Sequence, residues 1–231
     1  MIYRDITTGV NIFWSCHSSE SYEALQKDFD QLYLLIKNYL PEGVVSDWKN
    51  SITACVKAYF PNIAYQRCLS HLKRETCRLL SLKSPYNQTR ELRTIALEVL
   101  NISDPSDYYE WSIKLSDWLK KKESFLKEKT IGVGTKKKWW YTHGNPRRAV
   151  KLLIKDQEYT FRFLKHPFLP KTNNSLEGTN SQIKAKLGNH RGIKFNQQVS
   201  FVFWWLAFNR VKNLEDLRRL WVYLKKKKAI V

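Results

Sequence analysis

The chain is poor in cysteine and in long apolar runs, and both shortages narrow its class. Its four cysteines are unevenly spaced among 231 residues, so a disulfide framework is not expected. A reducing, cytoplasmic setting is expected instead. The longest apolar run extends from Val199 to Phe208 and is broken by Ser200, whereas a membrane span needs about 20 residues. Arg4 and Asp5 interrupt the N-terminal stretch, which therefore does not resemble a signal peptide.

Acidic residues are also scarce. The chain has 21 Asp and Glu residues against 40 Lys and Arg residues, which gives a formal net charge of +19. An excess of this size favours a polyanionic partner, and without a membrane-spanning run the partner expected is nucleic acid. The length suits one domain, or one domain with a large insertion, and a hydrophobic fraction of 43% is enough to form a core.

Hydrophobic periodicity predicts an α/β beginning followed by helices. Alternating and amphipathic patterns predict strands at 1–3 and 10–15, a helix at 21–40, a strand at 44–46, a helix ending at Phe60 and a strand at 63–67. From Cys68 to about Lys155 the patterns are almost entirely helical, and the chain ends with helices at 175–187, 196–212 and 214–228. The alternation at 159, 161 and 163 fits either a strand or a helix.

Asp47 stands where the short strand at 44–46 ends and the next helix begins. Aspartate is a favoured N-cap, because its carboxylate accepts a backbone N–H of the first helical turn. Ligands of open α/β sheets gather outside the carboxyl ends of strands, and a carboxylate there can hold a metal ion. The residues around Asp47, taken alone, favour its interpretation as a helix cap. The other motifs of the chain favour its interpretation as a metal ligand.

A second acid, Glu177, begins the late helix at 175–187. Asn174 and Glu177 have the spacing of a capping box. Gly178, however, costs about 1 kcal/mol relative to alanine in a helix, and the surrounding Thr, Asn and Gln side chains bury little. The cations that follow predict a surface that handles phosphate groups; they are Lys184, Lys186 and Arg191.

Cys68 and His71 form a Cys-x-x-His pair between the two acids. With Cys77 they supply three zinc ligands, whereas a structural zinc site needs four. Two other interpretations stay open at this point. Cys68 and His71 either begin a helix as a buried thiol and a hydrogen-bonding imidazole, or they support the acidic residues from outside the site.

A basic and aromatic segment lies between residues 136 and 148. Cations neutralise phosphates, and flat rings stack on unpaired bases. The alternative is that one tryptophan packs into a core beside a solvated lysine face. The candidate DNA-binding residues of this segment are Lys136, Lys137, Lys138, Trp139, Trp140, Arg147 and Arg148.

Three blocks resemble the bacterial Mutator-type insertion-sequence transposases, which belong to the DDE class and have an RNase H-like core. The first is GVVSDWKNSITACVKAYFPNIAYQRCLSHLKR, and the second is KKKWWYTHGNPRRA. The third is LPKTNNSLEGTNSQIKAKLGNHRGI, followed by FVFWWLAFNR. The resemblance covers most of residues 1–213, and the order and spacing of the blocks are more specific than any one of them.

The resemblance implies an α/β fold with an RNase H-like mixed sheet and a large all-helical insertion before the Glu177 helix. The corresponding domains are 1–78 and 168–231 for the core and 79–167 for the insertion. Asp47 then corresponds to the second metal-binding acid and Glu177 to the third, both binding Mg²⁺ or Mn²⁺, while Cys68 and His71 fall on the family signature. The implied activity is metal-dependent cleavage and strand transfer of DNA in the bacterial cytoplasm, associated with the nucleoid.

One departure limits that expectation. The family carries its first acid on a strand before the hairpin, and this chain begins at the hairpin, where Asp5 falls in the turn. The sequence is therefore expected to be a truncated transposase with an incomplete sheet, inactive alone, and to bind transposon ends and target DNA as a homo-oligomer or with intact transposase. Two alternatives remain: a non-catalytic DNA-binding or oligomerising remnant, and an unrelated basic helical interaction protein whose two acids are caps.

Overall fold

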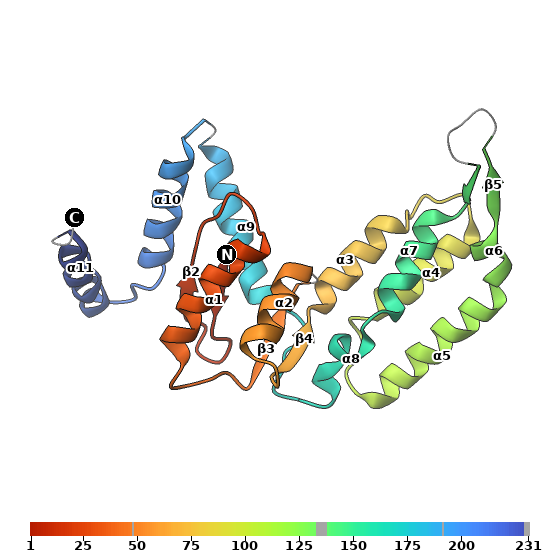
Figure 1. Cartoon of the computed structure of the whole chain (residues 1–231), viewed down its shortest axis with the longest axis horizontal. Coiled ribbons are helices and arrows are strands. Elements are labelled where there is room, and N and C mark those ends of the chain that lie inside the picture. Colours follow the sequence, from red (N-terminus) through yellow and green to blue (C-terminus); the bar gives the residue numbers. More distant parts are fainter. Residues whose placement is uncertain (48, 133–137, 191, 229–231) are drawn as a thin grey trace. The chain divides into compact units, whose positions relative to one another are not determined.

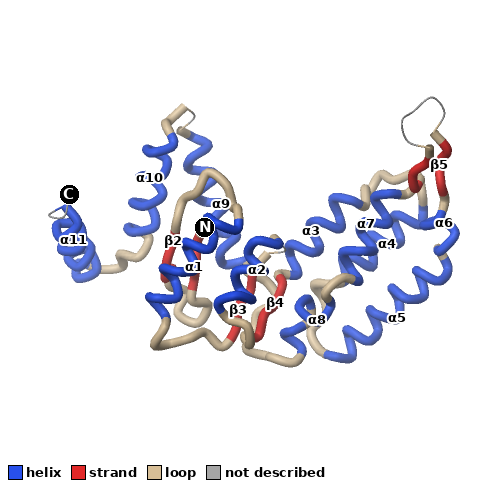
Figure 2. The backbone as a smooth tube through the Cα atoms, viewed as in Figure 1, coloured by secondary structure: helices blue, strands red, loops and turns tan. Residues whose placement is uncertain are grey.

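The computed structural model describes residues 1–47, 49–132, 138–190 and 192–228, and they form a mixed α/β structure in which helices predominate (Figures 1 and 2). The chain divides into two compact units. The central unit is Glu20–Asn173, and the terminal unit joins Met1–Ser19 with Asn174–Val231. None of the described helices has the length and hydrophobicity of a membrane span.

The central unit begins with alternating helices and strands and continues with helices. Its first elements are α1 (Tyr22–Ile36), β3 (Gly43–Ser46), α2 (Asn50–Tyr59), β4 (Ala64–Arg67) and α3 (Leu69–Leu79). Its later elements are α4 (Asn87–Glu98), α5 (Pro105–Lys121), α6 (Glu123–Lys127), β5 (Lys129–Ile131), β6 (Trp139–Tyr141), α7 (Gly144–Ile154), α8 (Gln157–Thr160) and the 3₁₀ helix η1 (Arg162–Leu164).

Strands β3 and β4 are parallel neighbours. Gly43 pairs with Ala64 at one end and Ser46 with Arg67 at the other. The two carboxyl ends therefore meet at the same edge, and Asp47 directly follows Ser46 at that edge. Helix α1 begins where the Ser21 hydroxyl accepts the Ala24 N–H at 3.3 Å.

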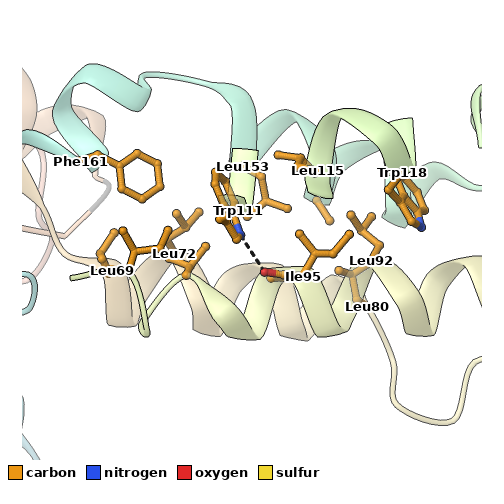
Figure 3. Packing of buried hydrophobic residues seen from close by; sticks show 14 of the residues in the cluster. Leu69, Leu72, Leu80, Leu92, Ile95, Trp111, Leu115, Trp118, Leu153 and Phe161 are labelled. Atoms are coloured by element: carbon orange, nitrogen blue, oxygen red, sulfur yellow. Dashed lines mark hydrogen bonds between the residues drawn. The ribbon is translucent and has the colours of Figure 1, made fainter. Parts of the chain in front are cut away.

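The helices from α3 to α7 contribute residues to one hydrophobic core (Figure 3). In that view Trp111 of α5 lies over α4, and its indole Nε1 donates to the Ile95 carbonyl at 2.9 Å. Leu69 and Leu72 of α3 belong to the same core. The core therefore contains residues from both sides of residue 78, where the sequence predicted a boundary between domains. Asp104 caps α5 and Pro105 is its first residue.

The buried Gln66 of β4 forms hydrogen bonds with residues of the segment at 159–163, for which the sequence pattern allowed either a strand or a helix. The Gln66 amide donates to the Thr160 carbonyl at 2.7 Å, and its oxygen accepts the Phe163 N–H at 3.0 Å. The segment is a short α-helix followed by a 3₁₀ turn, so that Thr160 and Phe163 both face Gln66. Its alternating aromatics follow from these turns and not from a strand.

The expectation of an all-helical insertion is corrected. The segment expected to be all-helical contains an antiparallel hairpin, in which Lys129 pairs with Tyr141 and Ile131 with Trp139. Within the described ranges the strands form three separate two-stranded sheets, β1–β2, β3–β4 and β5–β6. The hairpin escaped prediction because each strand has only three residues, too few to show a period.

The terminal unit combines the predicted N-terminal hairpin with the last three helices of the described residues. Arg4 joins the hairpin to the first of these helices by donating to the Ser175 carbonyl at 2.8 Å and to the Thr179 hydroxyl at 2.7 Å. Trp14 lies beside Phe203, with ring centroids 6.1 Å apart. The elements are β1 (Ile2–Arg4), β2 (Asn11–Trp14), α9 (Asn174–Asn189), α10 (Phe195–Phe208) and α11 (Leu214–Lys228).

Candidate functional site

Asp47 does not act as the helix cap that one interpretation assigned to it. The N-cap of α2 is Lys49, which follows Asp47 by two positions and makes no side-chain cap bond in the described structure. The Asp47 carboxylate accepts the N–H of Lys49 itself, at 3.3 Å, and not an N–H of the first helical turn. The Asp47 carboxylate is therefore not committed to holding the helix.

Asp47 lines a cavity of about 380 Å³ at the carboxyl edge of β3 and β4. Arg67, the last residue of β4, lines the same cavity, and so does His71 from the first turn of α3. Glu75 follows one helical turn after His71, because residues four apart share a face of a helix. The cavity therefore combines two carboxylates, an imidazole and cationic side chains within the central unit.

The cations of this cavity have acidic partners. Arg67 forms an ion pair with Asp156 at 3.1 Å, and Lys155 approaches the same carboxylate at 3.7 Å. Lys49 pairs with Glu20. Because these partners offset part of the positive charge, a divalent cation and a phosphate group can both approach the cavity.

Carboxylate oxygens, such as those of Asp47 and Glu75 in this cavity, are ligands of the kind that a hard divalent ion takes. Such an ion keeps several waters and is held by one or two carboxylates together with phosphate oxygens of the substrate. Asp47 supplies one carboxylate. Glu75 supplies another, although its carboxylate also pairs with Arg78 at 2.7 Å. Asp47 is therefore the better ligand of the two.

Cys68 and His71 contact each other at the start of α3. The buried Cys68 thiol donates to the Asn173 side-chain oxygen at 3.0 Å, and its sulfur accepts the Asn173 N–H at 3.4 Å. Burial acts to raise the pKa of the Cys68 thiol, but hydrogen bonds from His71 and from the Asn173 backbone outweigh it and leave the pKa below its usual value. The sequence interpretation of a buried thiol at a helix start agrees with this arrangement.

We expect Cys68 to ionise at a lower pH than an ordinary cysteine, because His71 and Asn173 stabilise its thiolate. Since the pKa is lower in the folded than in the unfolded chain, Cys68 stabilises the fold above the usual thiol pKa of 9.0, and this contribution disappears as the pH falls through the folded pKa. Thiolate absorbance during a pH titration of the wild type and of Cys68→Ser measures the difference.

Cys55 provides the control for that titration. Burial, together with the nearby Asp28 and Asp30, raises the pKa of the Cys55 thiol. Cys55→Ser should therefore remove absorbance only at the alkaline end. A Cys68→Ser difference that also appears only at the alkaline end would contradict the assignment.

The zinc interpretation with Cys77 does not fit the structure. His71 and Cys77 are six residues apart on α3, which separates them by about 9 Å along the helix axis at 1.5 Å per residue. At 3.6 residues per turn the two side chains also leave the helix about 120° apart, so they do not converge on one zinc ion. Cys77 is therefore not a ligand together with His71.

Glu177 lies in the first turn of α9, in the terminal unit, and is partly buried. The helix begins at Asn174, so Asn174 is its first residue and not the cap that precedes it. Lys184 and Lys186 are exposed on the same helix. Arg191 lies outside the described residues.

The aromatic and basic segment forms the β5–β6 hairpin and the start of α7. Trp139 and Trp140 are 48% and 41% exposed, so neither of them fills the core. The tryptophans in the core are Trp111 and Trp118. The Arg147 guanidinium stacks on Tyr141 at 3.5 Å, while Lys138 and Arg148 are exposed. Lys136 and Lys137 lie outside the described residues.

Sequence reasoning missed the other charged residues of the cavity, which are Lys49, Arg67, Glu75 and Lys155. Arg67 and Glu75 stand near the Cys68–His71 pair in sequence, but no local pattern marks them. Lys155 follows the end of α7 and reaches the cavity only through the packing of α7 against α3. No family model, curated protein or solved structure matches the chain.

Proposed function

We propose that the chain is a DNA transposase of the DDE type, with an RNase H-like core in which Asp47 is a metal-binding acid. One observation carries the proposal: the Asp47 carboxylate stands at the carboxyl edge of two parallel strands, in a cavity that it shares with cationic side chains. The formal net charge of +19 supports DNA as the substrate.

Three residues of the cavity have roles in this proposal. Asp47 holds a divalent ion, and Lys49 and Lys155 attract the phosphodiester. When bound, Mg²⁺ or Mn²⁺ activates the attacking oxygen and stabilises the leaving oxygen of an in-line displacement. Glu177 is assigned as a further metal-binding acid on the sequence resemblance alone.

The Asp47 assignment is tested by titrating the chain with Mn²⁺ and measuring free Mn²⁺ by electron paramagnetic resonance. Removing a residue that only supports a metal ligand costs about 10–100-fold in affinity, so Asp47→Asn, which removes a ligand, should cost at least tenfold. Asp104→Asn is the matched control, because asparagine also caps helix α5 and Asp104 lies outside the cavity. Unchanged affinity in Asp47→Asn would contradict the proposal.

A second candidate function is DNA binding without catalysis, as a remnant that competes with intact transposase or joins its oligomer. The exposed Trp139 and Trp140 favour it, because they offer a nucleic-acid surface away from the cavity. DNA affinity that is the same with and without Mn²⁺, and in Asp47→Asn, supports this second function over the first.

A further inference from the structure

The β5–β6 hairpin places its two tryptophans on opposite faces. Directly paired residues of an antiparallel hairpin point to the same face, and successive residues alternate. Ile131 pairs with Trp139, and Thr130 with Trp140. Trp139 and Trp140, which look equivalent in the sequence, therefore face different surroundings.

The Trp139 face is occupied by the chain itself. The Lys129 ammonium lies 4.2 Å from the centroid of the Trp139 ring. The Tyr141 ring meets Trp139 edge to face, with centroids 5.3 Å apart, and Arg147 covers Tyr141. One side of the Trp139 ring is thus already engaged by a cation.

The two faces differ in the partners of their rings and not in exposure, since Trp139 is 48% and Trp140 41% exposed. Thr130 and Thr142 flank Trp140 on its face, and their hydroxyls are hydrogen-bonded at 2.8 Å. Within the described part of the chain no aromatic ring or cation stacks on Trp140, which is 41% exposed. Its ring offers a flat surface beside two small side chains.

The base of the hairpin is held firmly, so the position of Trp140 is set in advance. An isolated two-stranded hairpin is marginally stable in water. Here the buried His143 contacts Glu128 at 2.9 Å and stacks on Phe125 with centroids 3.7 Å apart. The Thr142 N–H donates to the Glu128 carbonyl at 3.0 Å.

We propose that Trp140 is the stacking platform for an unpaired base at a DNA end, and that Trp139 serves to hold the hairpin. Every base has a π face, so stacking on an indole recognises unpaired bases without regard to sequence. The exposed Lys138, two residues before Trp140, supplies positive charge that attracts the adjoining phosphate. The inference rests on the proposed function, because it deepens DNA binding by naming the substrate as a frayed end.

The test compares the affinity of each variant for a blunt duplex and for the same duplex with an unpaired end. Stacking on one aromatic side chain is worth about 1–3 kcal/mol per base, so Trp140→Ala should weaken binding to the unpaired end about 5- to 150-fold. Binding to the blunt duplex should change little. Trp139→Ala is the matched control, and thermal unfolding of each variant checks that the fold is retained.

A second readout follows the base itself. With 2-aminopurine at the unpaired position, wild type and Trp140→Phe should quench its fluorescence, and Trp140→Ala should not. Equal weakening in Trp139→Ala and Trp140→Ala, or no weakening in either, overturns the inference while leaving DNA binding intact. Failure of the wild type to bind either DNA contradicts the proposed function itself.

Discussion

The affinity of the chain for duplex DNA is expected to fall by about 10³-fold or more between 50 and 200 mM salt. Each phosphate neutralised by lysine or arginine releases counterions, and 6–10 such interactions reduce affinity by about 10³–10⁵ over this range. A formal net charge of +19 makes that number of interactions available. Fluorescence anisotropy of a labelled duplex at a series of salt concentrations measures the slope.

Paired lysine variants locate the residues that bind phosphate. Replacing the exposed Lys184 and Lys186 of α9 with alanine should lower the slope by about 0.9 for each phosphate that is no longer neutralised. Lys114→Ala is the control, because Lys114 is paired with Glu98 at 3.1 Å. An affinity that barely depends on salt would contradict an electrostatic DNA interface.

Trp111→Ala is expected to destabilise the central unit by about 3–5 kcal/mol, the usual cost of truncating a buried tryptophan or phenylalanine. Trp111 of α5 is buried against α4, and its indole donates a hydrogen bond to the Ile95 carbonyl (Figure 3). Whole domains are stable by only about 5–15 kcal/mol, so this decrease is a large part of the total free energy of unfolding. Urea denaturation of the wild type and of Trp111→Ala measures it.

Tyr109→Ala is the matched control for that measurement. Tyr109 lies on the same helix, two residues earlier, and is 66% exposed. Exposed substitutions away from special features usually stay within about 0.5 kcal/mol. Equal effects of Trp111→Ala and Tyr109→Ala would contradict the position of the core.

Most elements of the fold could be predicted because local signals agreed with the packing. Ser21 caps α1, Asp104 caps α5, and Pro105 begins α5 where its missing N–H costs nothing. The β5–β6 hairpin could not be predicted, since its paired strands are three residues long and its cross-strand partners are set by register. The segment around Phe161 was ambiguous because Gln66, far away in sequence, determines its turns.

The candidate site was predictable only in part. The end of a short strand marked Asp47, and the Cys-x-x-His spacing marked Cys68 and His71. Lys155 joins Asp47 and His71 in the cavity through helix packing, which leaves no trace in local sequence. The distinction between Trp139 and Trp140 likewise depends on strand pairing, because adjacent residues face opposite sides only once the hairpin forms.

Iron-mediated backbone cleavage tests the central claim, that Asp47 is a metal-binding acid, most directly. Fe²⁺ bound in place of Mg²⁺ generates hydroxyl radicals with ascorbate and peroxide, and these cut the backbone beside the ion. The account predicts fragments ending near residue 47, suppressed by excess Mg²⁺ and absent in Asp47→Asn. Cleavage elsewhere, or cleavage that Asp47→Asn leaves unchanged, would contradict it.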